Sequence, residues 1–475
     1  MNQLTRMLSL GLITLLLGGA VACAAERPNI LLIMADDQGY GDTGYTGHPL
    51  IKTPNLDAMS KAGLRFDRFY AAAPVCSPTR GSVMTGRHPN RFGDFKWGNT
   101  LRPQEITIAE ALKKVGYTTG HFGKWHLGSV RVGDPVNPGN SGFDHWLSAP
   151  NFYDNDPILS LEGKAIQLRG ESSMIAADAA IEFMQLAVKN DKPFFSVVWF
   201  GSPHKPHQAA DEDKSIYPKD NKRRDWMGEI TGLDRAVGKL RAYLRDRKLA
   251  ENTLVWYCSD NGGLYTDSSG GRAKKGSIYE GGLRVPAIIE WPGRVKPGRV
   301  ITQPAVTSDI YPTLVALTGA TVEHQPPLDG VNLMPLIDGA DRVNRGPIGF
   351  WDYASAGIGT PAAKLMAELL AAQKAGDIDG DEKHIRNEAG DLSKQYPLDT
   401  LPGHAAWLDW PWKLHRIEKK KDGKVRFELY NLVDDPMEKH DLAGDQPQRV
   451  ASMKAALEDW QKQVMRSVNG EDYRQ

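Results

Sequence analysis

The stretch Asn29-Ile30-Leu31-Leu32-Ile33-Met34-Ala35-Asp36-Asp37 decides the fold class. Its apolar run from 29 to 34 is typical of a strand that is buried on both faces, as strands of parallel sheets are. The run ends in two carboxylates. Because ligands of such sheets bind beyond the carboxyl ends of the strands, this stretch predicts both a central strand and part of a site.

Three further runs repeat this pattern of an apolar strand that ends in polar residues. They are residues 116–122 before Gly123-Lys124-Trp125-His126, residues 194–200 before Ser202-Pro203-His204, and residues 253–258 before Asp260-Asn261-Gly262-Gly263. Helical patterns lie between them, at residues 55–62, 82–85, 107–115, 176–187 and 230–247. The alternation predicts an α/β fold with a mostly parallel central sheet flanked by helices.

The pattern changes near residue 340. A charged, partly helical insertion covers residues 354–400, and two strand candidates (412–417 and 425–430) precede a last amphipathic helix at 447–465. A chain of 475 residues also exceeds what one compact core usually supports. We therefore expect a main domain at 26–340 that carries the chemistry, and a smaller α+β domain at 341–475, with a short antiparallel sheet, that contributes to the substrate pocket.

Residues 1–25 are typical of a secretory signal peptide, with Arg6 ahead of an uncharged apolar run and small residues at its end. The run is shorter than the roughly 20 residues that a membrane-spanning helix needs, so no transmembrane segment is expected. Cleavage near residue 24 or 25 predicts an exported protein, periplasmic or secreted, while lipid anchoring through Cys23 is the alternative. The 58 basic residues balance 58 acidic ones, which argues against a nucleic-acid partner.

Oxygen ligands follow two of the predicted strands: Asp36 and Asp37 after one, Asp260 and Asn261 after the other. Carboxylates crowded at one edge of a sheet would repel each other, and a hard divalent cation relieves that repulsion. Oxygen donors favour Ca²⁺ or Mg²⁺ over zinc. The alternative is that the first pair caps the next segment and the second pair is a turn.

Basic side chains are expected at the same edge. Three fixed positive charges beside a dication suit a tetrahedral oxyanion, either sulfate or phosphate. His207 competes with His204 for one role, and His204 is preferred because it follows its strand directly. The candidates are Arg80, Lys124, His126, His204 and Lys275.

Cys76 stands in Pro74-Val75-Cys76-Ser77-Pro78-Thr79-Arg80-Gly81-Ser82, where a helix is expected to begin. Of the other two cysteines, Cys23 is lost or acylated and Cys258 lies in a buried strand, so Cys76 has no disulfide partner. A thiolate at a helix N-terminus is a fair nucleophile. Attack of sulfur on a sulfate ester, however, is poor chemistry.

The motif from Cys76 to Arg80 resembles the C-x-P-x-R signature of the type I sulfatases of the alkaline phosphatase superfamily. Gly123-Lys124-Trp125-His126-Leu127-Gly128 is similar to the second signature of that family. Residues 29–41, 260–263 and 275–282 resemble further family motifs, in family order, and the likeness runs from about 28 to 340.

The resemblance implies that Cys76 is oxidised to Cα-formylglycine by a formylglycine-generating or anaerobic sulfatase-maturing enzyme. It also implies hydrolysis of sulfate esters, most similar to that of enzymes acting on sulfated sugars, including the galactosamine-6-sulfatase branch. A metal, Ca²⁺ rather than Mg²⁺, is then held by the modified residue and the four oxygen ligands named above. The implied metal ligands are Asp36, Asp37, Cys76, Asp260 and Asn261.

The implied reaction has two halves. The formylglycine hydrate attacks sulfur while His204 protonates the departing alcohol and Lys275 assists, which leaves a covalent sulfo-enzyme. His126 then deprotonates the second hydroxyl, which expels sulfate. Arg80 and Lys124 orient the hydrate, and His404 is a further candidate for binding the substrate together with His204 and Lys275.

Two other functions remain open at this point. Related enzymes with the same fold, metal edge and aldehyde are phosphodiesterases or phosphonate monoester hydrolases. A sulfated-glycan-binding protein without catalysis is the other, although the complete set of candidate catalytic residues argues against it.

Overall fold

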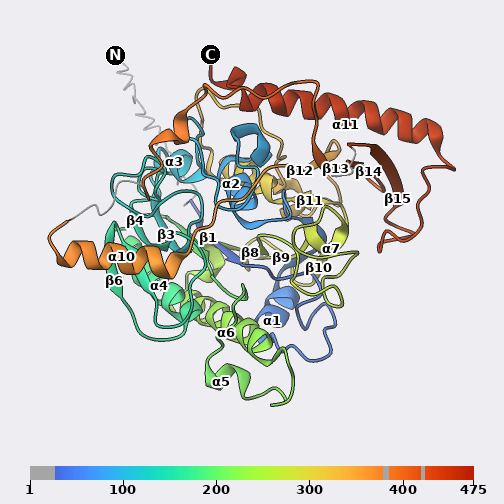
Figure 1. The fold of residues 1–475 in the computed structure, drawn as a ribbon. Coiled ribbons are helices and arrows are strands. Elements are labelled where there is room, and N and C mark those ends of the chain that lie inside the picture. Colours follow the sequence, from blue (N-terminus) through green and yellow to red (C-terminus); the bar gives the residue numbers. More distant parts are fainter. Residues whose placement is uncertain (1–26, 378–383, 419–422, 475) are drawn as a thin grey trace, which may run out of the picture.

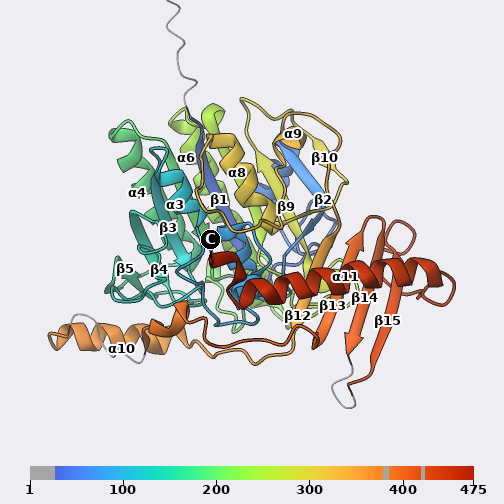
Figure 2. The same ribbon diagram turned by 90° about the horizontal axis from the view of Figure 1, so that it is seen from above.

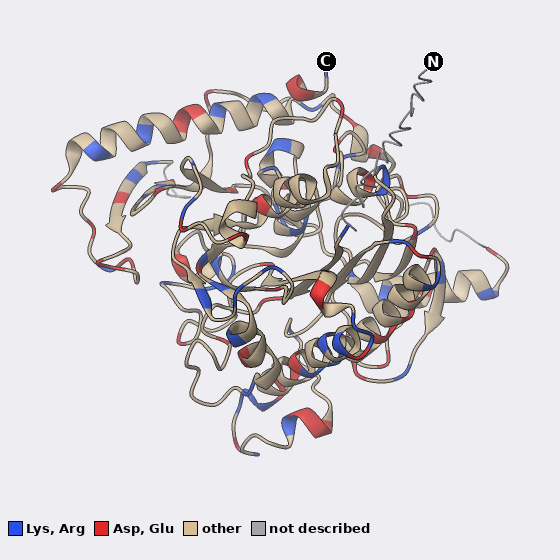
Figure 3. Cartoon of the chain, turned by 180° about the vertical axis from the view of Figure 1, so that it is seen from behind, with Lys and Arg blue, Asp and Glu red and all other residues tan. Residues whose placement is uncertain are grey.

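The computed structural model describes residues 27–377, 384–418 and 423–474. The expected signal peptide and Cys23 lie outside these residues. No helix within the described ranges is long and apolar enough to span a membrane. Acidic and basic residues are interleaved along the outer helices, as the balanced composition leads one to expect (Figure 3).

A sheet with a parallel centre forms the middle of the molecule (Figure 1). Its five parallel strands, in spatial order, are β8 (Thr253–Ser259), β1 (Asn29–Ala35), β7 (Phe194–Trp199), β3 (Thr118–Lys124) and β4 (His145–Ala149). Every residue of β1 is buried, as a strand covered on both faces requires. Met34 pairs with Trp199 on one side and Cys258 on the other, so these strands end at the same level.

Antiparallel strands extend this centre at both edges. β9 (Arg284–Glu290) pairs antiparallel with β8 and with β2 (Leu64–Tyr70), and β10 (Arg299–Ile301) and β11 (Ala305–Val306) pair parallel with β2. At the other edge, β5 (Ile158–Leu161) and β6 (Lys164–Gln167) are antiparallel. The predicted α/β fold with a mostly parallel sheet is confirmed, and the antiparallel edges are an addition to it.

Helices pack on both faces of the sheet and enclose two apolar cores. One face carries α1 (Pro54–Ala62), α4 (Ser172–Lys189) and α6 (Arg224–Asp246), and the other carries α2 (Cys76–Thr85), α3 (Ile108–Lys113) and α8 (Ile310–Thr318). All five predicted helices are present. The segment predicted at 82–85 is the end of a longer helix, α2, that begins at Cys76 and is buried throughout.

The C-terminal part forms a separate four-stranded antiparallel sheet, with α11 (Pro447–Val468) packed along it (Figure 2). Its strands are β12 (Ile348–Tyr353), β13 (Gly403–Asp409), β14 (Trp412–Glu418) and β15 (Val425–Asn431). The strand pair and the last helix predicted for this region are confirmed. The insertion contains α10 (Ala362–Lys374), which lies at the opposite end of the molecule from the small sheet (Figure 2). The domain boundary near 340 stays a prediction.

Candidate functional site

The aligned strand ends bring together the side chains that the sequence placed there. Asp36 follows β1, Lys124 ends β3 and Asp260 follows β8, and all three are completely buried. The register of the parallel strands therefore builds the centre of the site.

Cys76 reaches this centre from the first position of α2 and is 2% exposed. Its thiol donates to Oδ1 of Asp36 at 3.6 Å and lies 4.0 Å from Oδ1 of Asp37. Burial raises the pKa of the Cys76 thiol to about 12. The unmodified thiol is therefore protonated at neutral pH and poorly suited to act as a nucleophile.

Three carboxylates and three permanent cations alternate around the cysteine. Lys124 Nζ donates to Asp36 Oδ2 at 2.7 Å, and Lys275 Nζ donates to Asp37 Oδ2 at 2.7 Å. Arg80 donates from Nε and Nη2 to one oxygen of Asp260, at 3.1 and 2.7 Å. The fixed charges of these six groups cancel. A divalent cation would therefore make the centre strongly positive, as an anionic substrate requires.

Burial alone would raise the pKa of both Asp36 and Asp37. Lys124 and His204 outweigh burial at Asp36, and Lys275 and His204 outweigh it at Asp37, so that both pKa values lie below the usual value. Both carboxylates are thus ionised at neutral pH.

Asp37 adopts a left-handed backbone, with φ of 72°, which is uncommon for a residue other than glycine. Its amide donates to Asp260 Oδ1 at 3.0 Å, and its own Oδ1 accepts from Asn261 Nδ2 at 2.8 Å. These bonds between the ends of β1 and β8 hold this uncommon conformation in place.

Gly123 explains part of the second signature motif. Its φ is 105°, and a Cβ atom there would lie 2.0 Å from the carbonyl oxygen of Trp199. Glycine thus lets β3 and β7 approach closely at their ends, just before Lys124, which contacts Asp36.

His126, three residues further on, also has a left-handed backbone, with φ of 57°. It is buried, and neither ring nitrogen has a hydrogen-bond partner within the described chain. Burial, followed by the charges of Lys124 and Arg80, lowers the pKa of His126 well below its ordinary value. A neutral imidazole with an unpartnered nitrogen can accept a proton.

His204 faces the centre from the segment after β7, with Nε2 3.7 Å from Asp37 Oδ2. Its Nδ1 lies 2.5 Å from the carbonyl oxygen of Lys205, which can only accept, so Nδ1 carries a proton and Nε2 is the nitrogen that exchanges one. His207 instead bonds Glu229 at 3.0 Å, and this favours His204 as the histidine of the site. Phe152 stacks on the His204 ring at 4.1 Å. It was not predicted, because nothing in its local sequence marks it.

The donor set fits a hard divalent cation. Asp36, Asp37, Cys76 and His204 offer ligand atoms that lie within 4.8 Å of one another. Asn261 Oδ1 is buried and has no hydrogen-bond partner among the described residues, which suits an oxygen ligand. Both oxygens of Asp260 are engaged, one by Arg80 and one by the Asp37 amide.

His404 lies in a polar network of the C-terminal sheet. Its Nε2 is 2.9 Å from His415 Nδ1, and His415 in turn bonds Glu438 at 2.8 Å. Its predicted role in binding substrate stays a prediction.

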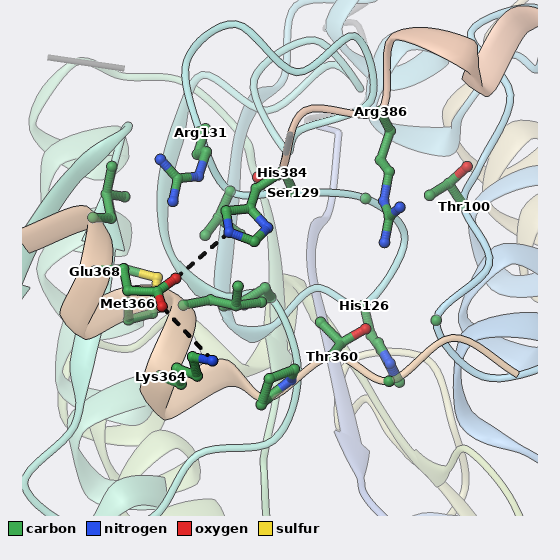
Figure 4. A pocket seen from close by; sticks show the side chains of 18 of the residues that line it. Thr100, His126, Ser129, Arg131, Thr360, Lys364, Met366, Glu368, His384 and Arg386 are labelled. Atoms are coloured by element: carbon green, nitrogen blue, oxygen red, sulfur yellow. Dashed lines mark ion pairs between the residues drawn. The ribbon is translucent and has the colours of Figure 1, made fainter. Parts of the chain in front are cut away.

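A cavity of about 240 Å³ adjoins the centre at His126 (Figure 4). One side is formed by residues 98–100 and 128–131 of the main domain. The other is formed by residues 359–369 of the insertion, together with His384 and Arg386. The insertion thus supplies a wall of the space beside His126, the candidate catalytic residue that lines this cavity.

Comparison with known proteins agrees with this geometry. Residues 28–320 match the family model described as sulfatase. The chain is 36% identical to human arylsulfatase A over 381 residues (71% of this chain and 73% of that protein). It is 33% identical to N-acetylgalactosamine-6-sulfatase of Canis lupus familiaris over 368 residues (69% of each).

A solved structure, that of Ps i-CgsB in complex with k-i-k-neocarrahexaose, superposes with a TM-score of 0.75 at 27% identity, covering 94% of this chain and 97% of that one. The extent of the family match and the identity to arylsulfatase A settle the assignment. The chain belongs to the sulfatase family and is a sulfuric ester hydrolase.

Proposed function

We propose that this sulfatase removes sulfate groups from a sulfated carbohydrate and releases inorganic sulfate. The observation that carries the proposal is the charge-balanced set of three carboxylates and three cations around Cys76. Two of the similar proteins support a carbohydrate substrate: one is named for N-acetylgalactosamine 6-sulfate, and the other was solved with a carrageenan-type oligosaccharide.

We further propose that Cys76 is the precursor of Cα-formylglycine and that Ca²⁺ binds to it together with Asp36, Asp37, Asp260 and Asn261. When present, the aldehyde hydrate supplies an oxygen nucleophile whose ionisation the cation favours. The covalent sulfo-enzyme stage that the resemblance implies is part of this proposal. The buried thiol is thus the starting material for the nucleophile.

The side chains of the site have separate roles in this proposal. His204 holds a proton at Nε2 and gives it to the departing alcohol oxygen as the S–O bond breaks, and Lys275 stabilises the charge on that oxygen. His126 accepts the proton of the second hydroxyl when sulfate leaves. Arg80 and Lys124 fix the positions of Asp260 and Asp36, and they neutralise charge at the sulfate.

Export belongs to the same proposal. Residues 1–25 direct the chain to the periplasm or the medium, with lipid attachment at Cys23 as the alternative route. A formylglycine-generating or anaerobic sulfatase-maturing enzyme acts on Cys76.

The test is an assay of purified, matured protein on 4-nitrophenyl sulfate, on bis(4-nitrophenyl) phosphate and on a set of defined sulfated oligosaccharides. Mass spectrometry of the peptide that contains Cys76 establishes maturation. Release of sulfate from oligosaccharides supports the proposal. Faster phosphodiester than sulfate turnover by orders of magnitude, or a native protein that carries only unmodified thiol, contradicts it.

A further inference from the structure

The cavity beside His126 has walls from two distant parts of the sequence. Residues 128–131 follow the second signature motif, whereas α10 and Arg386 belong to the insertion. The insertion therefore adds a wall to the space beside His126. The chemistry of this wall influences which substrates can bind.

The described lining is rich in positive charge. It contains three permanent cations, Arg131, Lys364 and Arg386, and one carboxylate, Glu368. Glu368 is already paired, with Lys364 at 3.9 Å and with His384 at 3.5 Å (Figure 4). Among the described lining residues, cations thus outnumber carboxylates, which favours an anionic occupant.

Two of these cations are placed to meet a ligand. The Lys364 side chain is 73% exposed at the rim, and Arg386 is 26% exposed and extends into the cavity toward His126 (Figure 4). The Arg386 amide donates to Asp134 Oδ2 at 2.8 Å, which fixes its backbone to the main domain. Among the described residues it forms an ion pair with Glu388 at 3.9 Å, a weak pair whose carboxylate is exposed.

The rest of the wall is apolar. Leu365, Met366 and Leu369 of α10 face the cavity together with Val130. A cationic rim above an apolar floor suits a ligand that has both C–H surface and a negative substituent. A sugar ring that carries a sulfate or a carboxylate has this combination, whereas a free inorganic anion has no apolar surface to bury.

We propose that this cavity, the α10 pocket, is a subsite for a second anionic group of the substrate. The pocket is lined by residues 98–100, His126, 128–131, Pro150, 359–361, 364–366, Glu368, Leu369, His384 and Arg386. The second anionic group is a sulfate or carboxylate on a sugar ring next to the ring that loses its sulfate. The substrate class is accordingly a polyanionic oligosaccharide rather than an isolated monosulfated sugar. Lys364 and Arg386 are the specificity-determining residues. The inference extends the proposed function, since His126 lies at the boundary between the pocket and the centre.

Binding is measured first, in the Cys76→Ala background, where no turnover interferes. Calorimetry compares Cys76→Ala with Cys76→Ala/Lys364→Ala/Arg386→Ala. The probes are 4-nitrophenyl sulfate, a mixed κ/ι neocarrahexaose with several sulfates, and a chondroitin 6-sulfate disaccharide with one sulfate and one carboxylate. We expect the two substitutions to weaken the binding of one of the oligosaccharides by about tenfold or more. The affinity for 4-nitrophenyl sulfate should stay unchanged. Loss of affinity for neocarrahexaose identifies the second group as sulfate. Loss of affinity for the chondroitin disaccharide identifies it as carboxylate.

The matched control is Lys374→Ala/Arg466→Ala, which removes two exposed cations, one from the same helix and one from α11, neither of which lines the pocket. The subsite proposal is overturned if the control variant loses as much oligosaccharide affinity as the pocket variant. It is also overturned if the pocket variant binds both oligosaccharides as tightly as the parent. Melting temperatures within about 2–3 °C of the parent show that the variants are folded.

Turnover separates failure of the subsite from failure of the proposed function. In matured enzyme, Lys364→Ala/Arg386→Ala is expected to raise KM for the favoured oligosaccharide about tenfold, with kcat and the rate on 4-nitrophenyl sulfate unchanged. Absence of any sulfate release by the parent enzyme defeats the proposed function. Normal sulfate release with identical KM in parent and variant defeats the subsite alone.

Discussion

The ammonium group of Lys124 lies 2.7 Å from Oδ2 of Asp36, and both side chains are completely shielded from solvent. Lys275 forms an equally short pair with Asp37, yet its side chain is 22% exposed. Two lysines with similar partners therefore differ in how much the fold depends on them.

Replacement of each lysine by methionine should separate these roles. Lys124→Met leaves a buried carboxylate without its main partner, and we expect it to lower the free energy of unfolding by about 3 kcal/mol. Lys275→Met should lower kcat by about 100-fold or more and should destabilise the protein less than Lys124→Met does, because solvent can reach the site that Lys275 leaves. Denaturant titration and steady-state kinetics on matured protein measure both quantities. Equal destabilisation by the two changes would contradict the assignment.

Cys76→Ala should abolish turnover and leave the fold intact, because the side chain that is lost makes only a weak thiol hydrogen bond in its buried position. Circular dichroism and calorimetric melting test the fold, and sulfate release tests activity. Cys258→Ala, which removes the other buried cysteine from β8, is the control and should keep full activity. Retained activity in Cys76→Ala would refute the proposed nucleophile.

Removal of the metal should stop catalysis without unfolding the protein. Lys124, Lys275 and Arg80 already neutralise the three carboxylates, so the centre does not depend on a cation for charge balance. Dialysis against EGTA is expected to eliminate sulfate release and to change far-ultraviolet circular dichroism little, and Ca²⁺ should restore the activity. Global unfolding on chelation would show that the ion has a structural role instead.

The two histidines should respond differently to the leaving group. His204→Gln removes the proposed proton donor, so kcat should fall about 10²–10⁴-fold for a sugar sulfate and much less for 4-nitrophenyl sulfate, whose phenolate leaves without protonation. His126→Gln should impair both substrates to a similar degree, because it acts after the alcohol has left. A comparison of kcat for the four pairs of variant and substrate checks this. If His126→Gln instead impaired the sugar sulfate selectively, His126 would be the proton donor and His204 the base.

His88 supplies a prediction about pH. Burial lowers the pKa of His88 to about 3, despite the neighbouring carboxylate of Asp329, whereas the unfolded chain has the ordinary value of 6.5. Between pH 6.5 and about 3, His88 binds a proton in the unfolded state but not in the folded state. Stability should therefore fall as the pH drops through this window, by about 1.4 kcal/mol per pH unit for this group.

His88→Gln should flatten this dependence relative to the parent protein. His440→Gln, at a histidine whose side chain is 82% exposed, is the control and should leave the dependence unchanged. Urea titrations at pH 7, 6 and 5 give the slopes. A slope in His88→Gln equal to that of the parent would contradict the prediction.

Much of the site could be predicted because its signals are local. A continuous apolar run such as residues 29–34 identifies a buried strand, and the polar residues that follow it must lie at the edge of the sheet. Parallel register then brings Asp36, Lys124 and Asp260 together without further information. β2 and β13 were not predicted: β2 contains three charged residues and no continuous apolar run, and the first half of β13 consists of glycine, histidine and two alanines rather than large apolar residues.

The α10 pocket could not be predicted from the sequence, because its walls meet only in three dimensions. More than 200 residues separate Val130 from Leu365, and neither segment carries a motif that predicts their contact with the same cavity. Phe152 is similar, since its importance lies in its stack on His204 rather than in its own neighbours.

The complete burial of α2 has a consequence for the order of events in the life of the protein. A modifying enzyme must grip several residues around its target, and in the finished fold every residue from 76 to 85 is inaccessible. The proposed oxidation of Cys76 therefore has to come first, on a chain that is still extended, and folding afterwards seals the product inside. On this proposal, molecules that fold before they are modified cannot be matured, and the active fraction of a preparation depends on the relative rates of modification and folding.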